Sequence, residues 1–160
     1  MLDSEEAVVA TATGAGKFQV RIDTGEQSFI MDEPAAYGGL SSGPSPFELL
    51  GSALSACTLM TMKLYADRKG WALDDVSVRV AHRKSSPDAR DQFERTIHFG
   101  TALSNEQRAK LLSIAERCPV HLLLDRGADV STSVADQGLA AAECSGLHEQ
   151  VIDELCKEAG

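Results

Sequence analysis

The stretch from residue 46 to residue 69 constrains the fold more than any other part of this 160-residue chain. Side chains of one face recur through it at helical spacing: Phe47, Leu50, Leu54, Cys57, Thr61 and Leu64. Further apolar residues occupy the other sides: Leu49, Ala53, Ala56, Leu59 and Met60. A helix that is apolar on all sides is buried in a core rather than laid on a surface. We therefore expect a buried central helix, around which the rest of the chain packs.

Both ends of this helix carry recognisable signals. Ser45 suits the N-cap, Pro46 suits the first helical position, and Glu48 can reach back to the cap as in a capping box. Gly70 follows the last helical residue, where glycine commonly ends a helix. The sequence predicts a helix from about residue 46 to residue 69.

Alternating apolar and polar residues predict antiparallel strands on both sides of the helix. We expect strands within residues 7–31, with turns at 13–16 and 23–26, and a hairpin formed by segments 76–80 and 93–99. Residues 32–45 are rich in Gly, Pro and Ser and predict a long loop. The remaining expected elements are a helix from Ser104 to about residue 115, a short helical turn at 120–124, a last strand at 128–134 and a helix at 147–158.

Composition limits the functional classes. The net charge is −9 and no basic patch is evident, so neither nucleic acid nor an anionic membrane is an expected partner. No uninterrupted apolar run reaches the roughly 18 residues that span a bilayer. The acidic N-terminus lacks the features of a signal peptide, which places the expected protein in the cytoplasm. A chain of this length predicts a single domain, residues 1–160.

Four cysteines are the candidates for chemistry. A cytosolic chain does not use them as a disulfide framework, and no C-x-x-C indicates a zinc site, so we expect neither a metal nor a cofactor. Cys118 precedes Pro119 at a helix break, and the N-cap of a new helix there would stabilise a thiolate. Taken alone, Cys57 is typical of a small buried hydrophobe, while Cys144 and Cys156 have no recognisable partner.

Three motifs, taken in order, resemble the OsmC/Ohr family, which includes osmotically inducible protein C and the organic hydroperoxide resistance protein. The motifs are Gly43-Pro44-Ser45-Pro46-Phe47-Glu48-Leu49-Leu50, Ala53-Leu54-Ser55-Ala56-Cys57-Thr58 and Ala115-Glu116-Arg117-Cys118-Pro119-Val120-His121. The resemblance covers about residues 10–135 and leaves a helical tail at 140–160. It is closest to a less characterised OsmC-like branch, which carries Asp-Glu-Pro before the loop and Cys-Pro-Val-His at the second cysteine.

The resemblance implies an α+β fold in which a long buried central helix packs against antiparallel sheets and two chains interlock as an intertwined homodimer. It also implies a thiol-dependent peroxidase, an oxidoreductase of the antioxidant, oxidative stress response. Cys57 would attack an organic hydroperoxide and become a sulfenic acid, and Cys118 would condense with it to a disulfide. A dithiol, typically lipoyl, would then reduce the disulfide.

The resemblance also identifies candidate residues around Cys57. The peroxidase branches carry a glutamate directly after the proline that precedes the cysteine helix, and here Phe47 holds that position with Glu48 one step later. They also carry an arginine after a Thr-Gly turn near the N-terminus, where this chain offers Lys17 and then Arg21. A positive neighbour matters because burial alone raises the pKa of a cysteine.

Two other functions compete with the peroxidase. A non-catalytic OsmC-like module would bind a small hydrophobic molecule or sense redox state, with Cys57 as a contact. A plain structural dimer would explain the buried helix but would make the two matched cysteines a coincidence.

Overall fold

The structure, a computed structural model, describes residues 6–142 and 144–160. The chain forms two compact units, Met1–Leu49 with Val130–Leu147 and Leu50–Asp129 with His148–Gly160, and each is described by itself. The expectation of one domain over residues 1–160 stays a prediction.

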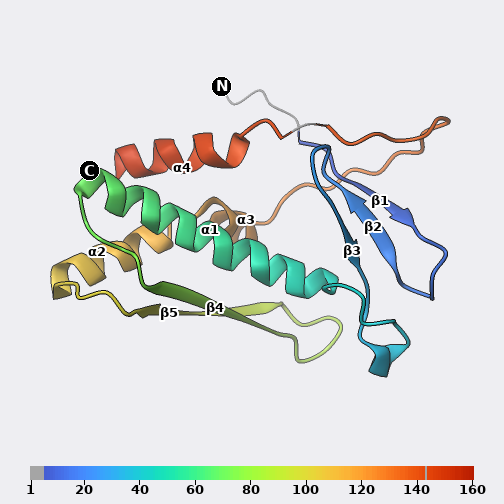
Figure 1. Ribbon diagram of the computed structural model, residues 1–160, viewed down its shortest axis with the longest axis horizontal. Coiled ribbons are helices and arrows are strands. Elements are labelled where there is room, and N and C mark those ends of the chain that lie inside the picture. Colours follow the sequence, from blue (N-terminus) through green and yellow to red (C-terminus); the bar gives the residue numbers. More distant parts are fainter. Residues whose placement is uncertain (1–5, 143) are drawn as a thin grey trace. The chain divides into compact units, whose positions relative to one another are not determined.

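The first unit contains a three-stranded antiparallel sheet with the strand order β1-β2-β3 (Figure 1). The strands are β1 (Val9–Ala12), β2 (Val20–Asp23) and β3 (Ser28–Met31). Strand β2 pairs with both neighbours, and the turns fall where the sequence predicts them. The strands predicted within residues 7–31 are confirmed.

The predicted loop that follows β3 is ordered by a buried aspartate. The Asp32 carboxylate accepts the backbone N–H groups of Leu40 at 2.9 Å and Ser42 at 3.3 Å, and the Ser42 hydroxyl at 2.7 Å. A short 3-10 helix, η1 (Ala35–Tyr37), lies inside the loop. At Gly43 a Cβ atom would lie 2.1 Å from the Ile30 carbonyl oxygen, so this close backbone approach requires glycine.

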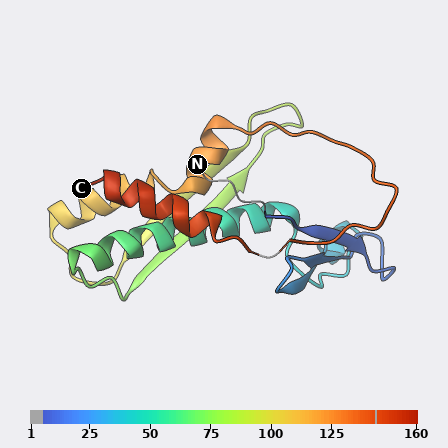
Figure 2. The same cartoon turned by 90° about the horizontal axis from the view of Figure 1, so that it is seen from above.

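The second unit is built around α1 (Pro46–Lys69), whose first residues belong to the first unit. A hairpin of β4 (Val76–Arg83) and β5 (Gln92–Phe99) runs along one side of it. Three shorter helices complete the unit: α2 (Asn105–Ala115), α3 (Pro119–Arg126) and α4 (Leu147–Glu158). Figures 1 and 2 show α1 packed among the hairpin, α2 and α4. These bounds confirm the predicted helices and hairpin.

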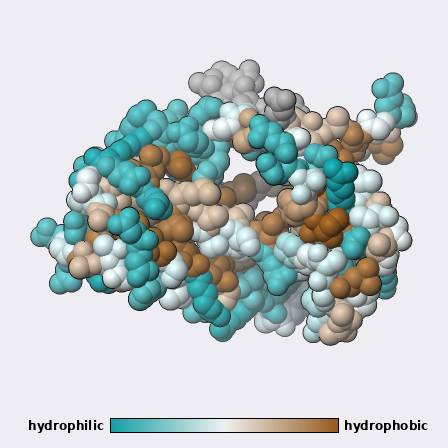
Figure 3. Space-filling view, in the orientation of Figure 1, coloured by the Kyte–Doolittle hydropathy of each residue, from teal (hydrophilic) through white to brown (hydrophobic). Residues whose placement is uncertain are grey.

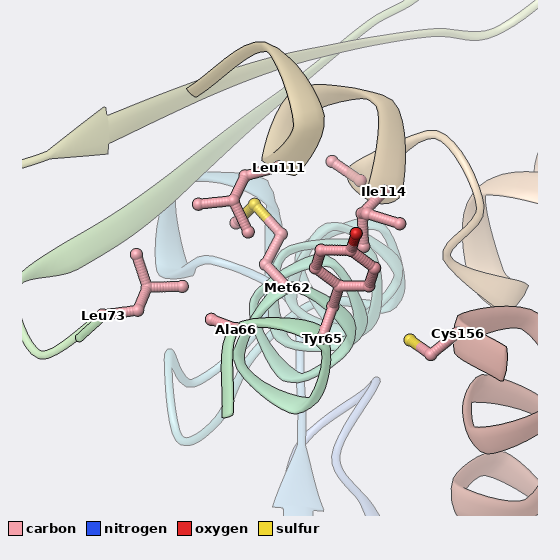
Figure 4. Packing of buried hydrophobic residues seen from close by; sticks show 8 residues of the cluster. Met62, Tyr65, Ala66, Leu73, Leu111, Ile114 and Cys156 are labelled. Carbon is pink, nitrogen blue, oxygen red and sulfur yellow. The ribbon is translucent and has the colours of Figure 1, made fainter. Parts of the chain in front are cut away.

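The main core of this unit lies where α1, α2 and α4 meet (Figure 4). Met62, Tyr65 and Ala66 project from α1 toward Leu111 and Ile114 of α2. Leu73, Ala115 and Cys156 complete the buried cluster. Partly buried side chains of β4 and β5 close it on the hairpin side: Val76, Val78, Ile97 and Phe99.

The expectation that the central helix is buried on all sides is wrong for the single chain. Seven α1 side chains are buried, but Leu50, Ala53, Ala56 and Met60 are exposed, with Met60 at 53%. Figure 3 shows brown hydrophobic residues at several places on the face of the molecule that it draws. The hairpin, α2 and α4 cover the other faces, and none of them covers this strip. By length and composition alone α1 could cross a membrane, but its buried side chains form a core, as in the central helix of a globular unit.

The strand expected at residues 128–134 is also wrong. The described residues offer these positions no ladder partner, and Val130 and Val134 are almost fully exposed. Alternating valines favour a strand, but a strand forms only when another supplies its hydrogen bonds.

Burial predicts very different costs for two adjacent leucines of α2. Leu111 is 0% exposed in the main core and Leu112 is 48% exposed. We expect Leu111→Ala to lower the free energy of unfolding by about 2–5 kcal/mol, because it leaves a cavity. Leu112→Ala should cost less than about 1 kcal/mol. Urea unfolding of both variants measures this, and equal costs would contradict the described packing.

Candidate functional site

The second unit brings Cys57 and Cys118 together in a small apolar cluster. Cys57 lies in the middle of α1 and Cys118 is the N-cap of α3. They are 2% and 0% exposed, and Leu54 is buried with them. Partly buried side chains pack around this cysteine cluster: Val80, Phe93, Val120 and Leu124. The predicted N-cap position of Cys118 is confirmed.

Local sequence explains this placement. Pro119 disfavours helical geometry at Cys118, so the chain turns there and a new helix starts with proline at its first position. The first N–H groups of a helix have no partner inside it and point outward from its start. The start of α3 therefore directs free N–H groups at the buried sulfurs.

The N–H groups at the start of α3 act on both sulfurs. The Cys57 and Cys118 side chains hydrogen-bond each other. The Val120 N–H donates to Cys57 Sγ at 3.5 Å. The Cys118 side chain makes no capping hydrogen bond at the start of α3, but the nearby N–H groups of His121 and Val120 lower its pKa. The Thr61 hydroxyl, which bonds the Cys57 carbonyl oxygen at 2.7 Å, adds a further contact to the Cys57 thiol.

The pKa values of the two thiols shift in opposite directions because each side chain is hydrogen-bonded to the other in a buried pair. The Cys57 thiol, hydrogen-bonded to Cys118, lowers the pKa of Cys118 to about 6 against the effect of burial, with help from the His121 N–H, the Thr58 hydroxyl and the Val120 N–H. The same hydrogen bond, followed by burial, raises the pKa of Cys57, and the Val120 N–H offsets only part of that rise. The pair therefore favours a single ionised thiol over two.

A buried arginine that sequence analysis missed, Arg95, bonds residues close to both cysteines. Arg95 of β5 has a side chain only 10% exposed, and its Nη1 donates to Thr58 Oγ1 and to the Ala115 carbonyl oxygen, both at 3.0 Å. Its Nη2 bonds Glu116 Oε1 at 2.7 Å. Thr58 is fully buried and donates to the Leu54 carbonyl oxygen at 2.7 Å. Arg95 thus fixes the orientation of the Thr58 hydroxyl, which contributes to the lowered pKa of Cys118.

The sequence contains a signal for Arg95. Arg95 lies on the same inward face of β5 as three apolar residues, Phe93, Ile97 and Phe99. A charged side chain on an apolar strand face is rarely buried without a partner, and here Thr58 and Glu116 provide the partners.

A cavity of about 340 Å³ opens beside the cysteine cluster. Leu54, Phe93 and Leu124 belong both to its wall and to the cluster. Polar side chains form the rest of the wall: Arg90, Asp91, Arg95, Glu116, His121 and Asp125. His121 Nε2 lies 3.2 Å from Glu116 Oε2. The cavity and the two sulfurs thus have three apolar neighbours in common.

The other predicted site residues lie in the first unit. Glu48 completes the predicted capping box, since its Oε2 accepts the Ser45 N–H at 2.8 Å and its own N–H donates to Ser45 Oγ at 3.4 Å. Lys17 Nζ stands 4.9 Å from the centre of the Phe18 ring. Arg21 pairs with Asp23 at 3.8 Å, with both side chains exposed. The structure brings together Cys57 and Cys118, and the roles of Glu48, Lys17 and Arg21 stay predictions.

Comparison with known proteins identifies the family of the chain. The sequence model of the OsmC-like protein family matches residues 39–133, which include both cysteines. No curated protein matches the chain in sequence.

Solved structures share the fold. A Psychrobacter arcticus protein named for osmotic stress induction and detoxification response is 18% identical, with a TM-score of 0.66 over 76% of this chain and 89% of its own. The organic hydroperoxide resistance protein OsmC of Legionella pneumophila is 20% identical, with a TM-score of 0.59 over 78% and 91%. The organic hydroperoxide resistance protein OhrB of Bacillus subtilis is 22% identical, with a TM-score of 0.52 over 74% and 89%.

The lowered pKa of Cys118 predicts that a thiolate forms at an unusually low pH. Ultraviolet absorbance should detect one thiolate per chain that forms as the pH rises through about 6, since the pKa of Cys118 is lowered to that value. Thr58→Val removes the hydroxyl and should move this step to higher pH, and Cys118→Ser should abolish it. Cys156→Ser, at the buried cysteine of the main core, should leave it unchanged. A wild-type protein without a thiolate below pH 8 would contradict this description of the site.

Proposed function

Because the chain belongs to the OsmC-like protein family, we propose that it is a thiol-dependent peroxidase that reduces organic hydroperoxides. The observation that carries the proposal is the buried, hydrogen-bonded pair of Cys57 and Cys118. Two relatives of the same fold are named for organic hydroperoxide resistance. An ionised cysteine beside a second cysteine is the arrangement that two-step thiol oxidation requires.

The chemistry needs both sulfurs. Cys57 attacks the distal oxygen of the hydroperoxide, the O–O bond breaks, an alcohol leaves and Cys57 becomes a sulfenic acid. The Cys118 thiolate then attacks the Cys57 sulfur and the S–O bond breaks, so that a Cys57–Cys118 disulfide remains and hydroxide leaves, which takes a proton from the solvent to become water. The lowered pKa of Cys118 suits the second step, because the thiolate is the attacking form.

A small dithiol of the lipoyl type would restore the pair. One of its thiolates attacks the disulfide, a mixed disulfide forms, and its second thiol releases the reduced protein. We place this cycle in the cytoplasm, where thiols are kept reduced. The apolar cover of Leu54, Phe93 and Leu124 supports a preference for organic hydroperoxides over hydrogen peroxide.

We also propose that the active form is a homodimer in which a second copy covers the exposed strip of α1. The strip contains Leu50, Ala53, Ala56 and Met60. These residues sit on the helix that carries Cys57, so burying them would remove water from the outer side of the site helix.

The catalytic assignment is tested by hydroperoxide consumption in the presence of excess dithiol. Cys57→Ser should abolish consumption, because serine cannot be oxidised in its place. The matched control is Cys144→Ser, which alters an exposed cysteine and should keep wild-type turnover. Retained turnover in Cys57→Ser would refute the assignment. Consumption of a single equivalent by the wild type would instead favour a binding or redox-sensing module.

The dimer is tested by sedimentation of Met60→Glu. A carboxylate in the middle of an apolar contact should shift the protein toward monomer by at least about tenfold in dissociation constant, because a buried unpaired charge costs several kcal/mol. Leu112→Glu, an equally exposed leucine on α2, is the control and should leave association unchanged. An unaffected Met60→Glu would exclude this strip from the interface.

A further inference from the structure

A disulfide between Cys57 and Cys118 requires two separate segments of the chain to stay at a fixed separation. The Cβ atoms of a disulfide lie about 3.5–4.5 Å apart, so a small drift of either segment prevents the bond. Cys57 is fixed in the middle of α1, but Cys118 lies in the short connection between α2, which ends at Ala115, and α3. The groups that tie this connection to α1 therefore decide how readily the two sulfurs join.

One nitrogen of Arg95 bonds both segments. Its Nη1 donates to Thr58 Oγ1, on the residue next to Cys57, and to the Ala115 carbonyl oxygen, each at 3.0 Å. The same carbonyl oxygen accepts the backbone N–H of Cys118 at 3.3 Å. A single guanidinium nitrogen thus lies between the turn of α1 that carries Cys57 and the carbonyl group that holds the backbone of Cys118.

The second nitrogen extends this link to α3. Arg95 Nη2 bonds Glu116 Oε1 at 2.7 Å, and the other oxygen of Glu116 lies 3.2 Å from His121 Nε2. His121 belongs to the first turn of α3, which begins directly after Cys118. The planar fork of a guanidinium holds several acceptors in fixed directions, whereas a lysine ammonium is a point charge on a flexible stem. Arg95 therefore ties β5, α1, the end of α2 and the first turn of α3 to one another.

We propose that Arg95 is a positioning residue that holds Cys57 and Cys118 at the separation at which their disulfide closes. The inference rests on the proposed function, since it concerns the second step of that cycle. Arg95 acts through Thr58 and Ala115, the groups that it bonds on the two segments. Loss of these bonds lets the segments drift, and the effective concentration of one sulfur at the other falls.

The burial of Arg95 favours this role over a purely stabilising one. Its side chain is only 10% exposed and shares its strand face with Phe93, Ile97 and Phe99. A buried ion pair is weak evidence for stability, because apolar residues of similar size are often equally stable in its place. A methionine could fill this face of β5, but it could not bond both cysteine-bearing segments.

Arg95→Met removes the link and leaves its former partners satisfied. Thr58 keeps its bond to the Leu54 carbonyl oxygen, and the Ala115 carbonyl oxygen keeps its backbone donor. The Glu116 side chain is 62% exposed and can turn to water. Arg95→Lys is the companion variant, since it keeps the positive charge near the cysteines but loses the fork. A loss that both variants share is therefore one of geometry rather than of charge.

The test is the equilibrium of the reduced protein with oxidised glutathione at pH 7. The two thiols and one glutathione disulfide give the Cys57–Cys118 disulfide and two molecules of glutathione, so two electrons and the thiol protons pass to glutathione. The equilibrium constant should fall at least about tenfold in Arg95→Met and at least about threefold in Arg95→Lys, because misplaced groups have a lower effective concentration. Arg83→Lys, at an exposed arginine of β4 that pairs with Glu94, is the matched control and should behave as the wild type.

Trapping of the Cys57 sulfenic acid gives a kinetic readout of the same effect. After one equivalent of cumene hydroperoxide, the sulfenic acid should persist at least about tenfold longer in Arg95→Met than in the wild type, because closure is slower. A sulfenic-acid-specific probe added at successive times measures this persistence. A merely structural arginine would change only the free energy of unfolding, and wild-type equilibrium and closure in folded Arg95→Met would overturn the proposal.

Two further outcomes keep the test decisive. If Arg95→Met does not fold, Arg95→Lys decides: the threefold loss supports the positioning role, and a wild-type glutathione equilibrium refutes it. The glutathione equilibrium uses no hydroperoxide. A wild type that forms the disulfide with glutathione but does not react with hydroperoxide would therefore refute the proposed peroxidase and leave the role of Arg95 standing. A wild type that forms no Cys57–Cys118 disulfide by either route would overturn both.

Discussion

The hydrogen bond between the Cys57 and Cys118 side chains is the interaction on which the chemistry of this chain depends. It needs α1 to be buried deeply enough to carry Cys57 into the cluster, and it needs α3 to start at Cys118 so that free N–H groups meet the sulfurs. The β4–β5 hairpin supplies Val80 and Phe93 to the cover and Arg95 to the support behind it. The elements of the second unit therefore converge on one buried pair of cysteines.

The second unit contains polar groups at the cysteines in addition to the residues that the family resemblance implies. In the peroxidase branches an arginine and a glutamate serve the attacking cysteine, and this chain has Phe47 where that glutamate stands. The second unit offers its own means of holding a thiolate, through the start of α3 and the Thr58 hydroxyl that Arg95 fixes. These groups act at the cysteine pair itself, since the Val120 N–H donates to Cys57 Sγ and Arg95 bonds Thr58, the next residue of α1.

Local signals made much of the fold predictable, because they act within a few residues. Proline and glycine bound α1 at Pro46 and Gly70, and Pro119 starts α3, so the N-cap position of Cys118 could be derived from the sequence. Features that depend on partners far away in the sequence could not be predicted in this way. The strand expected at 128–134 lacks a partner among the described residues, and the exposed strip of α1 reflects which elements of one chain reach the helix. Arg95 escaped notice because its partners come from α1 and α2, far away in sequence.

The most direct test is a peptide map, under non-reducing conditions, of fully reduced protein treated with one equivalent of an organic hydroperoxide. The account predicts rapid loss of the thiols of Cys57 and Cys118 and the appearance of a single disulfide joining their two peptides, with Cys144 and Cys156 still reduced. Thiols that remain unreacted, or a disulfide that involves Cys144 or Cys156 instead, would contradict a two-cysteine peroxidase built on this pair.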